Sequence, residues 1–341
     1  MERLARVAVC VCAAIAAPLA PSAWALDGTQ LAVVVNTLDP LSVRIGDYYA
    51  ARRRILFQNV IRVAIPHGRS VLTLDEFNTL KAVVDEQTLP RVQAYALTWA
   101  APYRVECMSI TAALAFGFDL SLCADGCKPT RVSSYFDSLA RRPFTAHGIR
   151  PTMAIAAETF EQAQALIDRG VAADGSFPEG TAYLLSTSDA ARNVRSAAYL
   201  DTERILWGRV RFRSLRRDAL TGAKDVFFYF TGKAHVDGLA TLGFLPGAVA
   251  DHLTSTGGML TDSSQMSALR WLEAGATGSY GTVVEPCNLL EKFPHPAVLA
   301  RHYLRGDTLI EAYWKSVRMP GQGIFIGEPL AAPFRRPGRA Q

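Results

Sequence analysis

The residues best suited to nucleophilic chemistry lie in the last third of the sequence. Cys287 follows Glu285 and Pro286 at the end of a β-branched run, and His235 lies earlier, just after another apolar run. A cysteine thiolate is a strong nucleophile, a histidine can accept its proton, and a carboxylate can orient that histidine. His235, Cys287 and Glu285 therefore form the first candidate catalytic group.

Two other interpretations of Cys287 remain open. Its sulfur could form a disulfide with Cys107, or it could be a buried thiol packed under the turn at Pro286. Free cysteine is among the most buried residue types, and a nearby acid such as Glu285 disfavours a thiolate. From sequence alone the structural thiol is the interpretation that we favour.

A weaker candidate group lies in the segment 251–258. His252 could act as a base for the hydroxyl of Ser255 or Thr254, but a hydroxyl needs a strong base held in register. Serine and threonine that precede a pair of glycines, as they do here, more often form loops. We therefore expect a loop, with His252 and Ser255 as secondary candidates.

The N-terminus indicates an exported protein. Two arginines precede a short apolar run at 7–17, and a small-residue site follows at Ala23–Ala25. This is the pattern of a secretory signal peptide, and its apolar run is too short to span a bilayer. We predict that residues 1–25 are a signal peptide, that the mature chain begins at Leu26, and that the protein is periplasmic or secreted.

Four cysteines remain in the predicted mature chain. An even number in an oxidising compartment favours disulfides. Cys123 and Cys127 flank a turn-forming Asp-Gly pair, which predicts a bridge between them and leaves the pairing of Cys107 with Cys287 open. Because Cys107, Cys123 and Cys127 lack a convincing fourth ligand for zinc, we expect no metal and no cofactor.

Composition and hydropathy narrow the function classes. The formal net charge of +5 over 341 residues is mild, so we expect no nucleic-acid partner. Half of the residues are hydrophobic, which is enough to bury a sizeable core. No run beyond the predicted leader approaches the ~18 apolar residues of a membrane helix, so we expect no stable membrane span after signal cleavage.

Strand and helix patterns alternate along the chain. A β-rich run at 31–35, an amphipathic stretch at 42–54 and a second β-rich run at 60–64 make a βαβ unit, which implies a parallel sheet covered by helices. The alternation resumes after residues 116–150, an irregular stretch that we interpret as an excursion from the sheet. Further strands are predicted at 225–230, 248–253, 280–284 and 323–326.

The segment Arg209–Arg213 places three arginines on one face of a predicted strand and two apolar residues on the other. The ordinary interpretation is a solvated edge strand, whose cations discourage aggregation. The functional interpretation is a contact with an anionic polysaccharide or a carboxylate.

Six segments of the predicted mature chain form a further pattern: Tyr48–Arg52, Asn59–Val60, Gly275–Asn288, Lys292–Pro294, Thr308–Trp314 and Gly327–Leu330. With these segments the chain resembles, over nearly its whole predicted mature length, a family of exported bacterial proteins. That family occurs in genomes that encode exosortase, the membrane enzyme associated with PEP-CTERM protein sorting and exopolysaccharide production. The resemblance implies an envelope protein whose partner is exopolysaccharide or a sorted protein.

The C-terminal half has a predicted strand ending at Thr231–Gly232, a nearby histidine, a second strand, a glycine-rich third strand and a closing Gly-acid-Pro turn. With these features it more distantly resembles gingipain-like and caspase-like cysteine peptidases. By position His235 would be the catalytic histidine. Where those enzymes carry their cysteine, this sequence has Leu253, Thr254 and Ser255, which puts peptidase activity in doubt.

These observations predict one large α/β domain over 26–333, followed by a flexible tail at 334–341. We expect a three-layer sandwich with a mostly parallel sheet, caspase-like or gingipain-like in its C-terminal half. Two functions remain: a non-catalytic envelope protein that binds a partner or glycan, or a cysteine hydrolase that uses His235 and Cys287.

Overall fold

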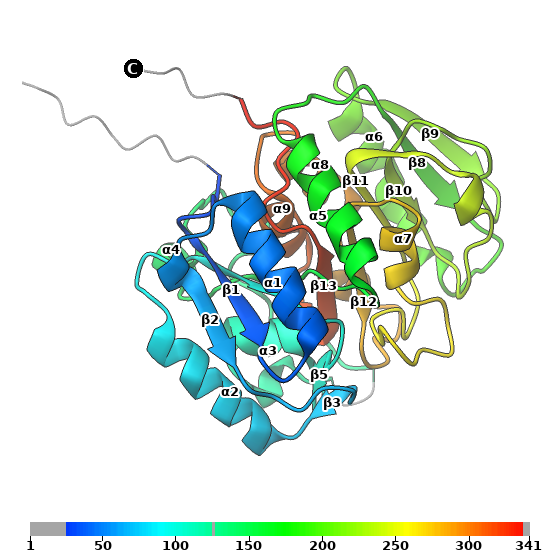
Figure 1. The fold of residues 1–341 in the computed structure, drawn as a ribbon. Helices are drawn as coiled ribbons and strands as arrows, with labels where there is room; N and C mark the ends of the chain where they lie inside the picture. Colours follow the sequence, from blue (N-terminus) through cyan, green and yellow to red (C-terminus); the bar gives the residue numbers. More distant parts are fainter. Residues whose placement is uncertain (1–24, 125–126, 337–341) are drawn as a thin grey trace, which may run out of the picture.

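The computed structural model describes residues 25–124 and 127–336, and a large sheet dominates it (Figure 1). This sheet has ten strands in the order β2-β1-β4-β7-β13-β12-β11-β10-β8-β9. They are β1 (Leu31–Asn36), β2 (Val60–Val63), β4 (Ala94–Leu97), β7 (Thr152–Ala154), β8 (Thr181–Ser186), β9 (Arg211–Arg216), β10 (Val226–Thr231), β11 (Phe244–His252), β12 (Gly278–Thr282) and β13 (Gly323–Gly327).

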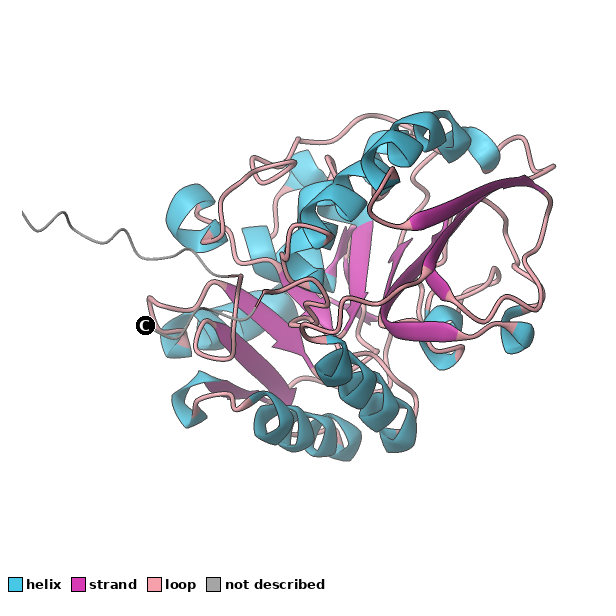
Figure 2. Cartoon of the chain, turned by 90° about the horizontal axis from the view of Figure 1, so that it is seen from above, coloured by secondary structure: helices cyan, strands magenta, loops and turns pink. Residues whose placement is uncertain are grey.

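Helices flank the sheet on both faces (Figure 2). A small second sheet contains β3 (Val71–Leu72), β5 (Arg104–Val105) and β6 (Met108–Ser109). The helices are α1 (Pro40–Arg53), α2 (Leu74–Gln87), α3 (Ile110–Phe116), α4 (Pro143–His147), α5 (Phe160–Ala173), α6 (Tyr199–Leu206), α7 (Leu269–Glu273), α8 (Pro296–Tyr303) and α9 (Leu309–Ser316). The predicted α/β class with a mostly parallel sheet is confirmed.

The sheet consists of two parallel halves that run in opposite directions. β12 and β13 pair antiparallel, whereas every other neighbouring pair in this sheet is parallel. The carboxyl ends of β8, β10, β11 and β12 therefore meet at one edge, where an open α/β sheet of this kind assembles its site. The amino ends of β8 and β9 lie at the opposite edge.

Local sequence explains many of the element boundaries. All six residues of β1 are buried, as expected for a strand covered on both faces. Thr73 and Glu76 form a capping box at the start of α2, and a second box starts α9 with Thr308 and Glu311.

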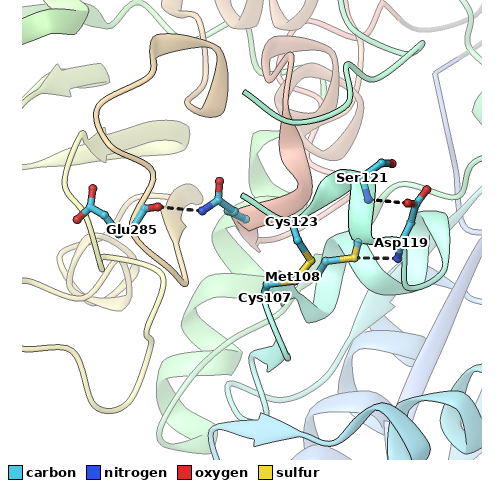
Figure 3. Close-up of a disulfide and its surroundings, with 7 residues drawn as sticks. Cys107, Met108, Asp119, Ser121, Cys123 and Glu285 are labelled. Carbon is cyan, nitrogen blue, oxygen red and sulfur yellow. Dashed lines mark hydrogen bonds between the residues drawn. A yellow bond between two sulfur atoms is a disulfide. The ribbon is translucent and has the colours of Figure 1, made fainter. Parts of the chain in front are cut away.

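The two disulfides correct the predicted cysteine pairing. The sulfur atoms join Cys107 to Cys123, shown in Figure 3, and Cys127 to Cys287. The predicted Cys123–Cys127 bridge is therefore wrong, because the Asp-Gly signal concerns only a local turn. Cys107–Cys123 instead closes the segment that contains α3, and Cys127–Cys287 ties the irregular stretch to the segment after β12. Two disulfides are compatible with a secreted or periplasmic protein.

The two ends of the described chain are packed against the core. Leu26 is buried, and Phe334 packs its ring against Phe227 and Tyr303, so the predicted tail does not begin at Phe334. Residues 1–24 of the predicted signal peptide and residues 337–341 of the tail lie outside the described residues. None of the described helices has the length and apolar character that crossing a membrane requires.

Candidate functional site

The carboxyl ends of β10, β11 and β12 meet at the edge of the sheet where folds of this kind assemble their site. The chain after β11 continues through Leu253, Thr254 and Ser255, the three residues that the sequence comparison sets at the position of the peptidase cysteine. The hydroxyl of Thr254 donates to Gln265 Oε1 at 2.6 Å and accepts from Arg192 Nε at 3.1 Å. Neither partner is a base, so Thr254 is held by a polar network that gives it no means of losing its proton.

His252 is locked into a structural role. It is buried, its Nε2 lies 3.0 Å from the carbonyl oxygen of Met266, and Trp271 Nε1 donates to its Nδ1 at 2.9 Å. A carbonyl only accepts, so Nε2 carries the proton and Nδ1 accepts. Burial lowers the pKa of His252 to about 3. Both ring nitrogens are occupied by structural partners, and His252 is no base for Ser255.

This environment of His252 predicts a pH-dependent stability. In the unfolded chain the pKa of His252 returns to 6.5, whereas in the folded protein it is about 3. Between these values the unfolded state binds a proton that the folded state does not, so stability falls as the pH drops, by at most about 1.4 kcal/mol per pH unit. His252→Gln should show a shallower loss of stability than the unsubstituted protein when urea unfolding is compared at about pH 4.5 and about pH 7. Parallel pH profiles for the two proteins would contradict this assignment.

The other predicted catalytic residues are His235 and Glu285, and both are exposed. His235 is exposed in a hollow of about 350 Å³ that Gln265 and Arg270 also line. Glu285 is exposed, and its Oε1 accepts from the backbone N–H of Cys287 at 2.7 Å. Among the described residues, no hydrogen bond or ion pair joins His235 to Cys287, Glu285 or Ser255. Within the described residues, Glu285 and Cys287 are therefore in contact, and His235 makes no direct contact with either of them through a hydrogen bond or an ion pair.

The disulfide decides the chemistry of Cys287. Its sulfur is bonded to the sulfur of Cys127, so in this oxidised state it is not a thiolate and cannot attack a carbonyl. Both the predicted nucleophile and the favoured structural thiol are thus corrected, and the partner is Cys127 rather than Cys107. No signal in the local sequence pointed to that partner, because 160 residues separate the two cysteines.

A hydroxyl–imidazole contact that sequence reasoning missed lies elsewhere. Ser138 Oγ and His147 Nε2 are 2.9 Å apart, and Ser138 Oγ also accepts from the backbone N–H of Ala140. Within the described residues, His147 Nδ1 has no hydrogen-bond partner, whereas a catalytic imidazole is oriented through its second nitrogen. The contact therefore has a structural role, because it joins the turn at Ser138 to the end of α4.

The opposite edge of the sheet carries a large, strongly basic cavity. It has a volume of about 1010 Å³ and lies where the chain enters β8 and β9. Glu179 is the one acid among the described residues that line it. We call this cavity the arginine groove, after its six arginines: Arg141, Arg209, Arg211, Arg305, Arg335 and Arg336.

Three of these arginines have guanidinium groups without a partner in the described part of the chain. The guanidinium groups of Arg209, Arg305 and Arg336 make no hydrogen bond or ion pair with the residues that the structure describes. By contrast, Arg211 donates to the carbonyl oxygen of Glu179 at 2.8 Å. Unpaired guanidinium groups in a concave surface are suited to bind carboxylates, because their fork of N–H donors matches the two carboxylate oxygens.

A second hollow continues the arginine groove along the edge strand β9. Its volume is about 780 Å³, and it shares Arg209, Val210 and Arg211 with the groove while adding Arg213. Trp207 also lines it and is 77% exposed. β9 is an edge strand as the sequence predicts, and its arginines border an extended surface with an aromatic face beside it.

Comparisons with known proteins bear on the fold. No family model and no curated protein matches the chain. A solved structure described as "Structure of Protease" is similar, with a TM-score of 0.51 and 10% sequence identity, over 90% of this chain and 79% of that one. The chain thus has a protease-like mixed α/β fold. Within residues 25–124 and 127–336, no cluster of three or more histidine, cysteine or acidic side chains could hold a metal ion.

Proposed function

We propose that this chain is an exported, non-catalytic binding protein on a protease-like fold, and that it holds an acidic glycan in the arginine groove. The observation that supports this proposal most is the basic lining of the groove, with six arginines and one acid, and the adjoining hollow, which adds Arg213 and holds Asp225 beside Arg211. The resemblance to the exosortase-associated family suggests that the glycan is an exopolysaccharide. In that case the protein would bind exopolysaccharide in the cell envelope.

Hydrolysis at the carboxyl-end edge has less support. His252 is held neutral by Met266 and Trp271, and Cys287 is bonded to Cys127. A displacement reaction needs a nucleophile within hydrogen-bond reach of its base. No described pair at this edge meets that requirement, so binding is the function that we favour.

The groove has the chemistry that acidic sugars require. A uronic acid residue presents a carboxylate to arginine forks and a face of C–H groups to an aromatic ring. Arg209, Arg305 and Arg336 supply the unpaired guanidinium groups, and Trp207 supplies the exposed ring. A polymer with a carboxylate on successive sugars would contact several arginines at once.

The test is a calorimetric titration of the mature protein with a galacturonic acid hexamer. Arg209→Gln/Arg305→Gln should weaken binding at least about tenfold, because hydrogen bonds to charged groups contribute about 1.5–3 kcal/mol each. Neither guanidinium has a described intramolecular partner, so the folded state should be unaffected. Binding should also weaken as salt is added.

The matched control is Arg216→Gln/Arg217→Gln. It removes the same charge from exposed positions at the far end of β9, outside both hollows, and should bind like the unsubstituted protein. Equal weakening by both double variants would show a nonspecific charge effect. Equal affinity for a neutral glucose hexamer, or no binding of the acidic one, would refute the proposal.

A further inference from the structure

The backbone of Leu26 is fixed inside the protein. Its side chain is buried in the main core, and its exposed fraction is 0%. Its N–H donates to Glu311 Oε2 at 3.2 Å, and its carbonyl oxygen accepts from Arg335 Nη2. Ala25, the residue before it, is 3% exposed and lines the arginine groove. The first two described residues, Ala25 and Leu26, are therefore packed into the fold.

Glu311 has unequal partners on its two oxygens. Its exposed fraction is 0%, and Oε2 accepts from Thr308 N at 2.9 Å and from Thr308 Oγ1 at 2.7 Å, besides Leu26 N. Oε1 is also buried and has no hydrogen-bond donor among the described residues. A buried carboxylate oxygen without a donor is costly, so this position is suited to a further cationic donor.

The neighbouring cation, Lys315, is already paired with another acid, Asp307. Lys315 Nζ binds Asp307 Oδ2 at 2.7 Å, and His302 Nδ1 lies 3.0 Å from the same oxygen. Arg141 reaches Asp307 Oδ1 at 3.5 Å. Burial, with the nearby charge of Asp307, raises the pKa of Glu311, while Lys315 opposes that rise. Among residues 25–124 and 127–336, no cation is thus bound directly to Glu311.

We propose that signal-peptide removal completes this site, through a buried ion pair between the new α-ammonium group of Leu26 and the carboxylate of Glu311. The inference rests on the predicted cleavage after Ala25. Hydrolysis of the Ala25–Leu26 amide consumes one water, leaves a carboxylate on Ala25, and gives Leu26 an amine that takes up a proton. One N–H donor then becomes three, which can serve Oε2 and the unpartnered Oε1 of Glu311.

Processing in this scheme precedes folding. Ala25 and Leu26 are buried in the folded protein, so a signal peptidase must act on the chain as it is exported. The ion pair then forms as α9 docks. At the start of the same helix, Leu309 N donates to Ala331 O at 2.8 Å, so α9 contacts both the N-terminus and the segment 331–335. In this scheme the mature N-terminus therefore stabilises the folded protein.

The test uses two exported proteins. One has the natural sequence, and the other has Gly-Ser inserted between Ala25 and Leu26, so that cleavage leaves Leu26 with an amide N–H. Intact mass should place the first N-terminus at Leu26. Glu311→Gln is then made in both, and the melting temperature should fall by at least ~4 °C more in the natural-length protein, which alone has the ion pair. Glu76→Gln, in the exposed capping box of α2, is the matched control and should show no such difference.

Amine labelling gives a second measurement that needs no substitution at Glu311. The α-amine of the natural-length protein should react with an acylating reagent more slowly in the folded than in the unfolded state, about tenfold for each unit by which pairing raises its pKa. The inserted protein should label rapidly in both states. An N-terminus other than Leu26, rapid labelling of folded Leu26, or equal effects of Glu311→Gln in the two proteins would overturn the proposal. Glycan binding is not a readout here, so the two proposals fail separately.

Discussion

Replacing Arg195 with methionine is expected to lower the free energy of unfolding by about 3–5 kcal/mol, because the buried carboxylate of Asp251 loses its cation. Arg195 is 2% exposed and Asp251 is 1% exposed. The guanidinium pairs with Asp251 Oδ1, and its Nη2 donates to the carbonyl oxygens of Thr231 and Asp251 at 2.7 and 3.0 Å. This cluster joins the 3-10 helix Asn193–Ala198 to the carboxyl ends of β10 and β11.

Urea unfolding of three variants tests this assignment. Arg195→Met/Asp251→Asn should be more stable than Arg195→Met, since no charge then remains buried without a partner. Arg204→Met removes an exposed guanidinium that pairs with Asp201, and it should change stability little. If Arg195→Met costs no more than Arg204→Met, the buried pair is not the structural anchor of this edge.

The second large effect concerns the disulfides. Cys127→Ser/Cys287→Ser opens a loop of 160 residues, and Cys107→Ser/Cys123→Ser opens one of 16. The loop-entropy relation gives about 5 kcal/mol for the long loop and about 3 kcal/mol for the short one. We therefore expect both double variants to unfold at lower urea concentration, with the larger loss for the Cys127–Cys287 bridge.

Which of the two double variants loses more free energy of unfolding tests the loop-entropy explanation. Peptide mapping without reduction should first recover the pairs Cys107–Cys123 and Cys127–Cys287. A larger loss for the short loop would mean that the long bridge constrains the unfolded chain less than its separation implies. Recovery of a Cys123–Cys127 peptide would restore the sequence prediction and contradict the pairing.

Local patterns in the sequence predicted much of the fold. The βαβ unit around β1, α1 and β2 depends on residues close together in the chain. The reversal between β12 and β13 depends on pairing between Gly278 and Gly327, and neither strand carries a signal for it. Cysteine pairing likewise depended on contacts between distant segments.

The candidate site was harder to predict than the fold. His252 has the residue type of a base, but its partners Met266 and Trp271 are set by the loop and helix after β11, and they make it structural. Arg195 gave no sequence signal that it would pair with Asp251, although Asp251 lies in a segment that the peptidase resemblance includes. The arginines of β9 were visible in sequence, whereas Arg141 and Arg305 join them only through the fold.

Hydrogen exchange with and without a galacturonic acid hexamer tests most directly whether this protein binds glycan in the arginine groove. Slower exchange is predicted in peptides that cover 207–213 and 304–306, where Arg209, Arg211 and Arg305 lie. Peptides over 233–238 and 253–266, at the carboxyl ends of β10 and β11, should be unchanged. Protection confined to 233–238 and 253–266 would place the ligand at the position of a peptidase active site and contradict the proposed function.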